Sequence, residues 1–93
     1  MLLDKARAAL RYKTLALDDE ISDAIAAGEA DLRLVGIAVP DTDAAVEADP
    51  MLLCAVLLYV KAQFDFAGLG ERFRAAYDSL KISLSMAGGY YVE

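Results

Sequence analysis

The side chains that could carry chemistry in this chain are carboxylates and one thiol, because the sequence has no histidine and a single cysteine, Cys54. Histidine is the commonest general base and a frequent metal ligand, so its absence removes the usual centre of acid–base or metal chemistry. Cys54 lies within the apolar run MLLCAVLLYV, where no base accompanies it. We therefore predict a buried, inert thiol, and one cysteine cannot form an internal disulfide.

Two clusters of acidic residues invite comparison with metal sites. The first comprises Asp18, Asp19 and Glu20. The second comprises Asp41, Asp43, Glu47 and Asp49. In the first cluster, negative charge in a first helical turn complements the helix dipole, and Asp18 is placed to cap a free amide. The second cluster lacks the glycine turn and bidentate glutamate of a calcium loop, so we expect a solvated acidic segment and no metal or other cofactor.

The remaining candidate for chemistry is the glycine-containing stretch GLG at residues 68–70. It is too short for a phosphate-binding loop, and it follows a predicted helix rather than a strand. The carboxylates have no predicted cleft around them. We therefore expect that the protein is not an enzyme.

Four amphipathic helices are predicted to position these groups in a small all-α domain that spans residues 1–93. The chain contains 18 alanines, which favour closely packed helices. Apolar residues recur at helical spacing in segments 2–11, 18–35, 50–64 and 71–84. A thirteen-residue loop, 37–49, is predicted between the second and third helices, and residues 85–93 are predicted to form a flexible tail.

Local signals fix several helix ends and surface pairs. Asp49 followed by Pro50 is a strong helix start, and Gly36 is placed to end the second helix. Gly28 lies on the apolar stripe of that helix, which indicates either weak selection or the close approach of a neighbouring helix. Surface ion pairs are predicted at helical spacing: Glu29 with Arg33, Glu71 with Arg74, and Arg74 with Asp78.

The segment from Met51 to Phe64 is apolar nearly all round, which marks it as the central helix. It is bounded by charge and is about half the length of a membrane span, so no membrane association is expected. Its predicted core face comprises Leu53, Val56, Leu57, Val60 and Phe64. The remaining apolar surface, around Leu52 and Tyr59, is either buried by other helices or meets another subunit.

Charge is distributed unevenly, although the net charge is −6. The first 13 residues carry four basic side chains and one acidic one, whereas residues 14–50 carry ten acidic side chains and one basic one. An acidic middle argues against gripping nucleic acid, which requires a basic surface. We expect the basic N-terminal helix to pair with the acidic segments.

Several stretches together resemble the head–tail connector proteins of tailed bacteriophages, and in particular the small helical family of gp6-like DNA-packaging adaptors. The resemblance covers roughly residues 2–84 and is carried by LRY, LDDEI, DPMLLCAVLLYVKAQF and ERFRAAYDSLKISLS. These motifs are patterns of packing residues and include no catalytic signature.

The resemblance implies a structural protein that assembles as a ring, commonly dodecameric, beneath the portal at the head–tail junction of the virion. The implied partners are further copies of the chain, the portal protein and a downstream head-completion or tail protein, with DNA passing through the channel without specific binding. Synthesis is expected in the bacterial host cytoplasm. Candidate interface or channel-lining residues are Asp41, Asp43, Glu47, Leu52, Tyr59, Tyr90 and Tyr91. The alternative is a small acidic module that mimics DNA and occupies the DNA site of a host enzyme.

Overall fold

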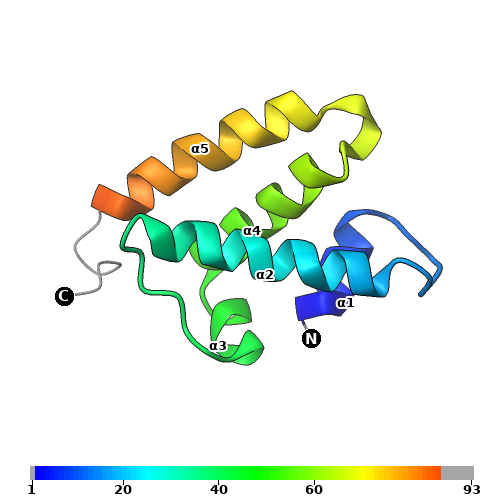
Figure 1. The fold of residues 1–93 in the computed structure, drawn as a ribbon, viewed down its shortest axis with the longest axis horizontal. Helices are drawn as coiled ribbons and strands as arrows, with labels where there is room; N and C mark the ends of the chain where they lie inside the picture. The colour runs from blue at the N-terminus through cyan, green and yellow to red at the C-terminus, as the bar shows by residue number, and fades with distance from the viewer. Residues whose placement is uncertain (1, 87–93) are drawn as a thin grey trace.

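The helices of this chain are arranged around one central helix, as the computed structural model shows for residues 2–86 (Figure 1). The elements in order are α1 (Leu2–Ala9), α2 (Asp18–Leu34), α3 (Asp43–Glu47), α4 (Pro50–Gln63), the 3₁₀ turn η1 (Phe66–Gly68) and α5 (Gly70–Met86). The prediction of a small all-α fold is confirmed.

The central helix is α4, which contacts every other element in this part of the chain. Its most extensive contacts are with α5 and α2, and the shorter α1 and α3 contact it as well. Figure 1 shows α5 along one edge, α2 in front of α4, and α1 and α3 along the opposite edge. No helix among the described residues is both long enough and apolar enough to cross a membrane.

The predicted start of α4 is confirmed by its hydrogen bonds. Asp49 Oδ1 accepts hydrogen bonds from the backbone amides of Met51 at 3.0 Å and Leu52 at 3.3 Å, and Pro50 occupies the first helical position. The capping carboxylate satisfies amides that have no partner inside the helix. Proline fits there because its missing N–H would have had no partner inside the helix.

The predicted end of α2 is also confirmed. Gly36 has a φ of 85°, a left-handed conformation that costs glycine little. The amide of Ile37 then reaches back to the carbonyl of Leu32 at 3.2 Å, and that of Gly36 to the carbonyl of Arg33 at 3.0 Å. This is a Schellman motif, and the side chains of Leu32 and Ile37 that accompany it are fully buried.

Gly28 explains how closely α2 and α4 approach each other. A Cβ atom at this position would lie 3.0 Å from the ring of Tyr59, closer than ordinary van der Waals contact. The close-approach interpretation of Gly28 is therefore confirmed. The missing side chain leaves a notch in α2 that holds an aromatic ring of α4.

The turn between α4 and α5 contains two non-glycine residues in left-handed conformations. Asp65 has a φ of 47° and Ala67 a φ of 56°. The Asp65 side chain accepts a hydrogen bond from the amide of Gly70 at 2.8 Å, which satisfies a free donor at the start of α5. The strained backbone is thus held by a contact that also begins the next helix.

Three predicted boundaries are wrong. The predicted loop 37–49 contains α3, where Thr42 Oγ1 accepts a hydrogen bond from Ala45 N at 3.3 Å and Val46 is fully buried. A five-residue helix with one buried side chain is too short to show a period in the sequence. The first helix ends at Ala9 rather than Arg11, and α5 continues to Met86, two residues into the predicted tail. The rest of that tail lies outside the described residues.

Candidate interaction surface

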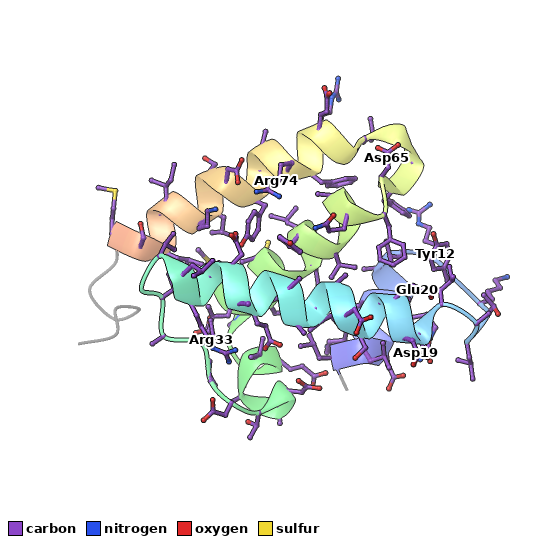
Figure 2. All side chains as sticks on the ribbon, in the orientation of Figure 1. Tyr12, Asp19, Glu20, Arg33, Asp65 and Arg74 are labelled. Carbon is purple, nitrogen blue, oxygen red and sulfur yellow. The ribbon has the colours of Figure 1, made fainter. Side chains whose placement is uncertain are left out.

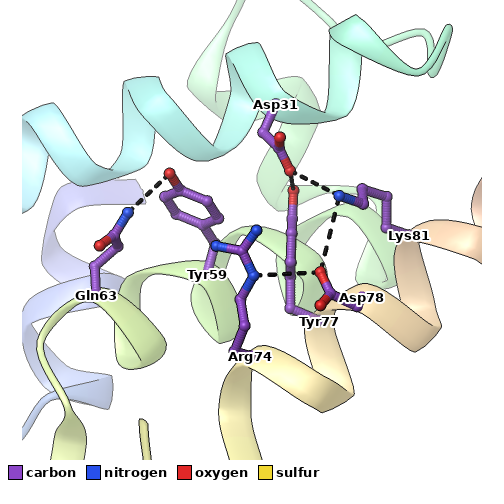
Figure 3. A network of polar contacts seen from close by, with 7 residues as sticks. All are labelled: Asp31, Tyr59, Gln63, Arg74, Tyr77, Asp78 and Lys81. Atoms are coloured by element: carbon purple, nitrogen blue, oxygen red, sulfur yellow. Dashed lines mark hydrogen bonds and ion pairs between the residues drawn. The ribbon is translucent and has the colours of Figure 1, made fainter. Parts of the chain in front are cut away.

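One network of polar contacts joins α5 to α2 (Figure 3). The buried Tyr77 hydroxyl donates to Asp31 Oδ2 at 2.6 Å, and Lys81 Nζ donates to the same oxygen at 3.1 Å. The hydrogen bond from Tyr77, with help from Lys81, lowers the pKa of Asp31 below its ordinary value. Burial and the bond to Asp31 raise the pKa of Tyr77. All three groups satisfy one another, so the network holds the fold together.

Tyr59 lies in this same interior region. Its ring packs edge-to-face against Tyr77 at a centroid distance of 5.2 Å, and its hydroxyl accepts a hydrogen bond from Gln63 Nε2 at 2.9 Å. The Arg74 guanidinium lies 5.8 Å and 5.7 Å from the centroids of the Tyr59 and Tyr77 rings, respectively. Tyr59 therefore belongs to the core of the subunit.

Leu52 and Tyr59, predicted as candidates for a subunit interface, are only 2% and 8% exposed, so that assignment is wrong for the single chain. The physical reason is that a helix apolar on all sides does not reveal which face meets its neighbours. One residue of α4 does indicate which of its faces points outward. The only charged residue of α4, Lys61, lies on the outer face.

The surplus apolar surface of α4 is on the side opposite Leu52 and Tyr59. An open groove of about 300 Å³, here termed the α4 groove, is lined by Pro50, Leu53, Cys54, Leu57, Leu58 and Lys61. These residues are spaced three and four apart, so they occupy one helical face. Cys54 is exposed, and the prediction of a buried thiol is wrong. Leu53 and Leu57, predicted for the core face, are half-buried at the edge of the core.

Large apolar side chains are also exposed near the ends of α2 and α5. Leu34 is 83% exposed, Ile82 58% and Met86 75%, and the two helices finish at the same end of the molecule (Figure 1).

The acidic candidates lie at the surface near α3. Asp41 and Asp43 are exposed and Glu47 is half-buried. Among residues 2–86, no group of three potential ligands could hold a metal ion. Asp19 and Glu20 mark a second acidic surface at the start of α2 (Figure 2). Tyr90 and Tyr91 lie outside the described residues.

The basic N-terminal helix pairs with an acidic segment, as predicted. Arg7 donates from Nε to Asp18 Oδ1 at 2.8 Å and from Nη2 to Asp18 Oδ2 at 2.7 Å, a bidentate pair between α1 and α2. This pair lowers the pKa of Asp18 and raises that of Arg7. Asp18 does not cap α2 as predicted, because Arg7 occupies its carboxylate.

The predicted surface pairs are formed only in part. Arg74 and Asp78 pair at 3.3 Å, as predicted. The Arg33 guanidinium instead donates to the carbonyl oxygens of Val39 and Pro40, at 3.3 Å and 3.2 Å, and so holds the segment after α2. Burial raises the pKa of Glu29, the partner predicted for Arg33.

The described residues thus define a small helical domain, with polar contacts that hold its helices together and with some apolar side chains exposed. A family model described as "Phage connector protein" matches residues 2–91. The chain therefore belongs to the phage connector family, and the resemblance to head–tail connectors is confirmed. Comparison with curated proteins and with solved structures finds no significant match.

Proposed function

We propose that the protein assembles as a ring beneath the portal of a tailed bacteriophage or prophage, where it extends the DNA channel and allows head completion and tail joining. The observation that carries this proposal is the connector-family match over residues 2–91. In this proposal the protein acts at the head–tail junction of the virion after synthesis in the host cytoplasm. It performs no catalysis.

The arrangement of apolar surfaces supports a ring. A cyclic assembly with one chain per position uses two different surfaces of each subunit, so that every contact joins unlike faces. The α4 groove and the apolar end of α2 and α5 are two such surfaces. A ring of about twelve copies is the proposed state, with portal on one side and a head-completion or tail protein on the other.

The charge of the chain supports a channel through which DNA passes without being held. Its net charge of −6 gives a surface that repels phosphate. Acidic residues of segment 18–23 or of segment 41–49 are proposed to face the channel or a neighbouring subunit, and Asp41 and Asp43 in the second segment are exposed near α3.

Negative-stain microscopy and light scattering across a range of protein concentrations test ring formation. We expect rings at high concentration and binding to purified portal protein. A strictly monomeric chain that also fails to bind portal would contradict the proposal. Recovery of a host DNA-binding enzyme in place of portal would instead favour the DNA-mimic alternative.

Neutralising the acidic segment tests its role separately. The combined substitutions Asp41→Asn, Asp43→Asn and Glu47→Gln remove three charges while keeping the side chains' size. We expect altered ring formation or DNA passage with unchanged helix content by circular dichroism. Asp19→Asn with Glu20→Gln, at the start of α2, tests the other acidic segment in the same way. Unchanged assembly and infectivity in the triple variant would count against a role in contacts or the channel.

A further inference from the structure

We propose that the outward face of α5 in one copy lies in the α4 groove of the next copy, with the two helices antiparallel. This inference rests on the proposed ring and assigns the two surfaces that form its repeating contact. It follows from the position of the groove, the exposure of the α5 face and the match of charges between them.

The α4 groove is the receiving surface. Its floor is formed by Leu53, Cys54, Leu57 and Leu58, and Lys61 stands at its far end. Among residues 2–86, Lys61 forms no ion pair with a carboxylate. Its ammonium lies 5.6 Å and 5.3 Å from the ring centroids of Phe66 and Phe73, respectively. The groove therefore offers an apolar floor and a cation that can take a carboxylate from outside the subunit.

The outward face of α5 is the inserting surface, and it is termed the α5 ridge. Its four exposed residues are Ala75, Ser79, Ile82 and Met86. They are spaced four, three and four apart, so they lie in one stripe. The buried residues of α5, Tyr77 and Leu84, occupy the opposite side of the helix. Small residues at one end of the ridge and large apolar ones at the other suit a helix that lies in a groove.

The register follows from matching these two stripes. When α5 runs antiparallel to α4, placing Met86 beside Cys54 also places Ile82 beside Leu57 and Leu58, because both helices rise about 1.5 Å per residue. The same register brings Asp78 beside Lys61, at the far end of the groove. Asp78 pairs with Arg74 at 3.3 Å and with Lys81 at 3.8 Å, and its side chain is 48% exposed, so it can accept Lys61 of the next copy as a third partner.

The parallel orientation lacks this complementarity. If α5 ran parallel to α4 of the next copy with Ile82 over the middle of the groove, Asp78 would lie near Pro50. Lys61 would then have no carboxylate beside it. Charge pairing between the two surfaces therefore selects the antiparallel arrangement.

Such a contact joins unlike faces, so one of the two copies keeps a free groove and the other keeps a free ridge. Addition of further copies therefore continues until the chain of subunits closes. A contact between two α4 grooves would instead produce a closed dimer.

Cross-linking through Cys54 tests the contact directly, because this residue is the only cysteine and it lies in the groove. The variant Met86→Cys is assembled at ring-forming concentration and oxidised with copper–phenanthroline. We expect a ladder of cross-linked species on non-reducing gels, because every subunit then carries one thiol on each of the two surfaces. Cα atoms must approach to within about 7 Å for this bond to form.

The matched control is Leu15→Cys, whose position is 67% exposed and therefore comparable with Met86 at 75%, but lies outside both surfaces. Adding Cys54→Ala to Met86→Cys should abolish the ladder. Equal cross-linking of Leu15→Cys, or efficient dimerisation of the unsubstituted protein through Cys54 alone, would overturn the assigned contact.

A charge exchange provides an independent test. Lys61→Glu should raise the concentration needed for ring formation about tenfold, because it places a second carboxylate beside Asp78 of the next copy and the two repel each other. Adding Asp78→Lys should restore assembly. Failure of restoration in a double variant that folds normally would contradict the register. Rings that form without the 54–86 cross-link would overturn this contact alone, whereas absence of rings in the unsubstituted protein would overturn the proposed function.

Discussion

The two faces of α4 are composed of similar apolar side chains but have opposite surroundings. Leu52, Val56 and Tyr59 are buried, whereas Cys54 is exposed and Leu57 is half-buried along the groove. The buried face meets a surface shaped for it, including the Gly28 notch that holds the Tyr59 ring. The outer face meets no comparable surface within residues 2–86. The shape of the neighbouring elements, rather than hydrophobicity alone, therefore determines which face of α4 is buried within the subunit.

The largest expected difference between these faces is in folding stability. Leu52→Ala should lower the free energy of unfolding by about 2–5 kcal/mol, because it empties a fully packed position. Leu57→Ala should cost only about 1 kcal/mol, because its side chain is already half in water. Urea denaturation monitored by circular dichroism, at a concentration where the chain is monomeric, measures both. Equal losses would show that the two faces are not distinct.

The hydrogen bond from Tyr77 should give the next largest effect. Tyr77→Phe removes a donor to an ionised partner, and such bonds contribute about 1.5–3 kcal/mol. Tyr59→Phe is the matched control, because its hydroxyl bonds to the neutral Gln63 and should contribute about 1 kcal/mol. If Tyr59→Phe lowered the free energy of unfolding more than Tyr77→Phe, the Tyr77–Asp31 hydrogen bond would not be the stronger of the two.

The notch at Gly28 should tolerate no added methyl group. Gly28→Ala gains about 1 kcal/mol in helix propensity but forces the Tyr59 ring to move, and overpacking typically costs about 1–3 kcal/mol. The net result should be a loss of about 1 kcal/mol, measured by the same denaturation. Ala27→Gly, on the exposed side of α2, controls for propensity alone. A stabilised Gly28→Ala variant would show that the ring has room to shift.

The pH dependence of folding stability should reveal how much the ionised Asp31 carboxylate contributes to that stability. Its folded pKa lies below the ordinary value of about 4, so its stabilisation is complete above that pH. The contribution is lost as pH falls through the lower folded pKa. Stability measured from pH 6 to pH 2 should therefore decline less steeply in Asp31→Asn than in the unsubstituted protein. Parallel curves would mean that Asp31 titrates as it does in the unfolded chain.

The smallest stability effect is expected on the outer face. Cys54→Ser replaces an exposed thiol and should change the free energy of unfolding by less than about 0.5 kcal/mol. Thermal unfolding followed by circular dichroism measures this change. A loss of more than about 1 kcal/mol would indicate that the outer face is buried within the monomer.

Features set by neighbouring residues were predictable from the sequence. The Asp49–Pro50 start of α4 and the Gly36 end of α2 depend on side chains and backbone angles within a few positions. The apolar stripe of α2 also proved to be its buried face, because residues three and four apart share a helix surface. Gly28 was recognised as unusual, although the ring that it accommodates could not be named.

Features set by distant residues were not predictable in this way. Tyr77 and Asp31 are 46 positions apart, and nothing near either residue indicates the other as its partner. The orientation of α4 was missed for the same reason, since its surroundings come from α2 and α5. The sequence therefore leaves open whether Leu52 and Tyr59 are buried within the chain or meet another subunit, and the structure buries both.

The bidentate bond between Arg7 and Asp18 has a consequence for how the subunit opens. With only eight residues, α1 is too short to persist as a free helix, so docking and helix formation are one event. Its amide protons should therefore exchange with solvent together, in a cooperative step that leaves α4 and α5 protected. Because protonation of Asp18 removes the acceptor of that bond, acid should accelerate this opening before the rest of the helical core unfolds.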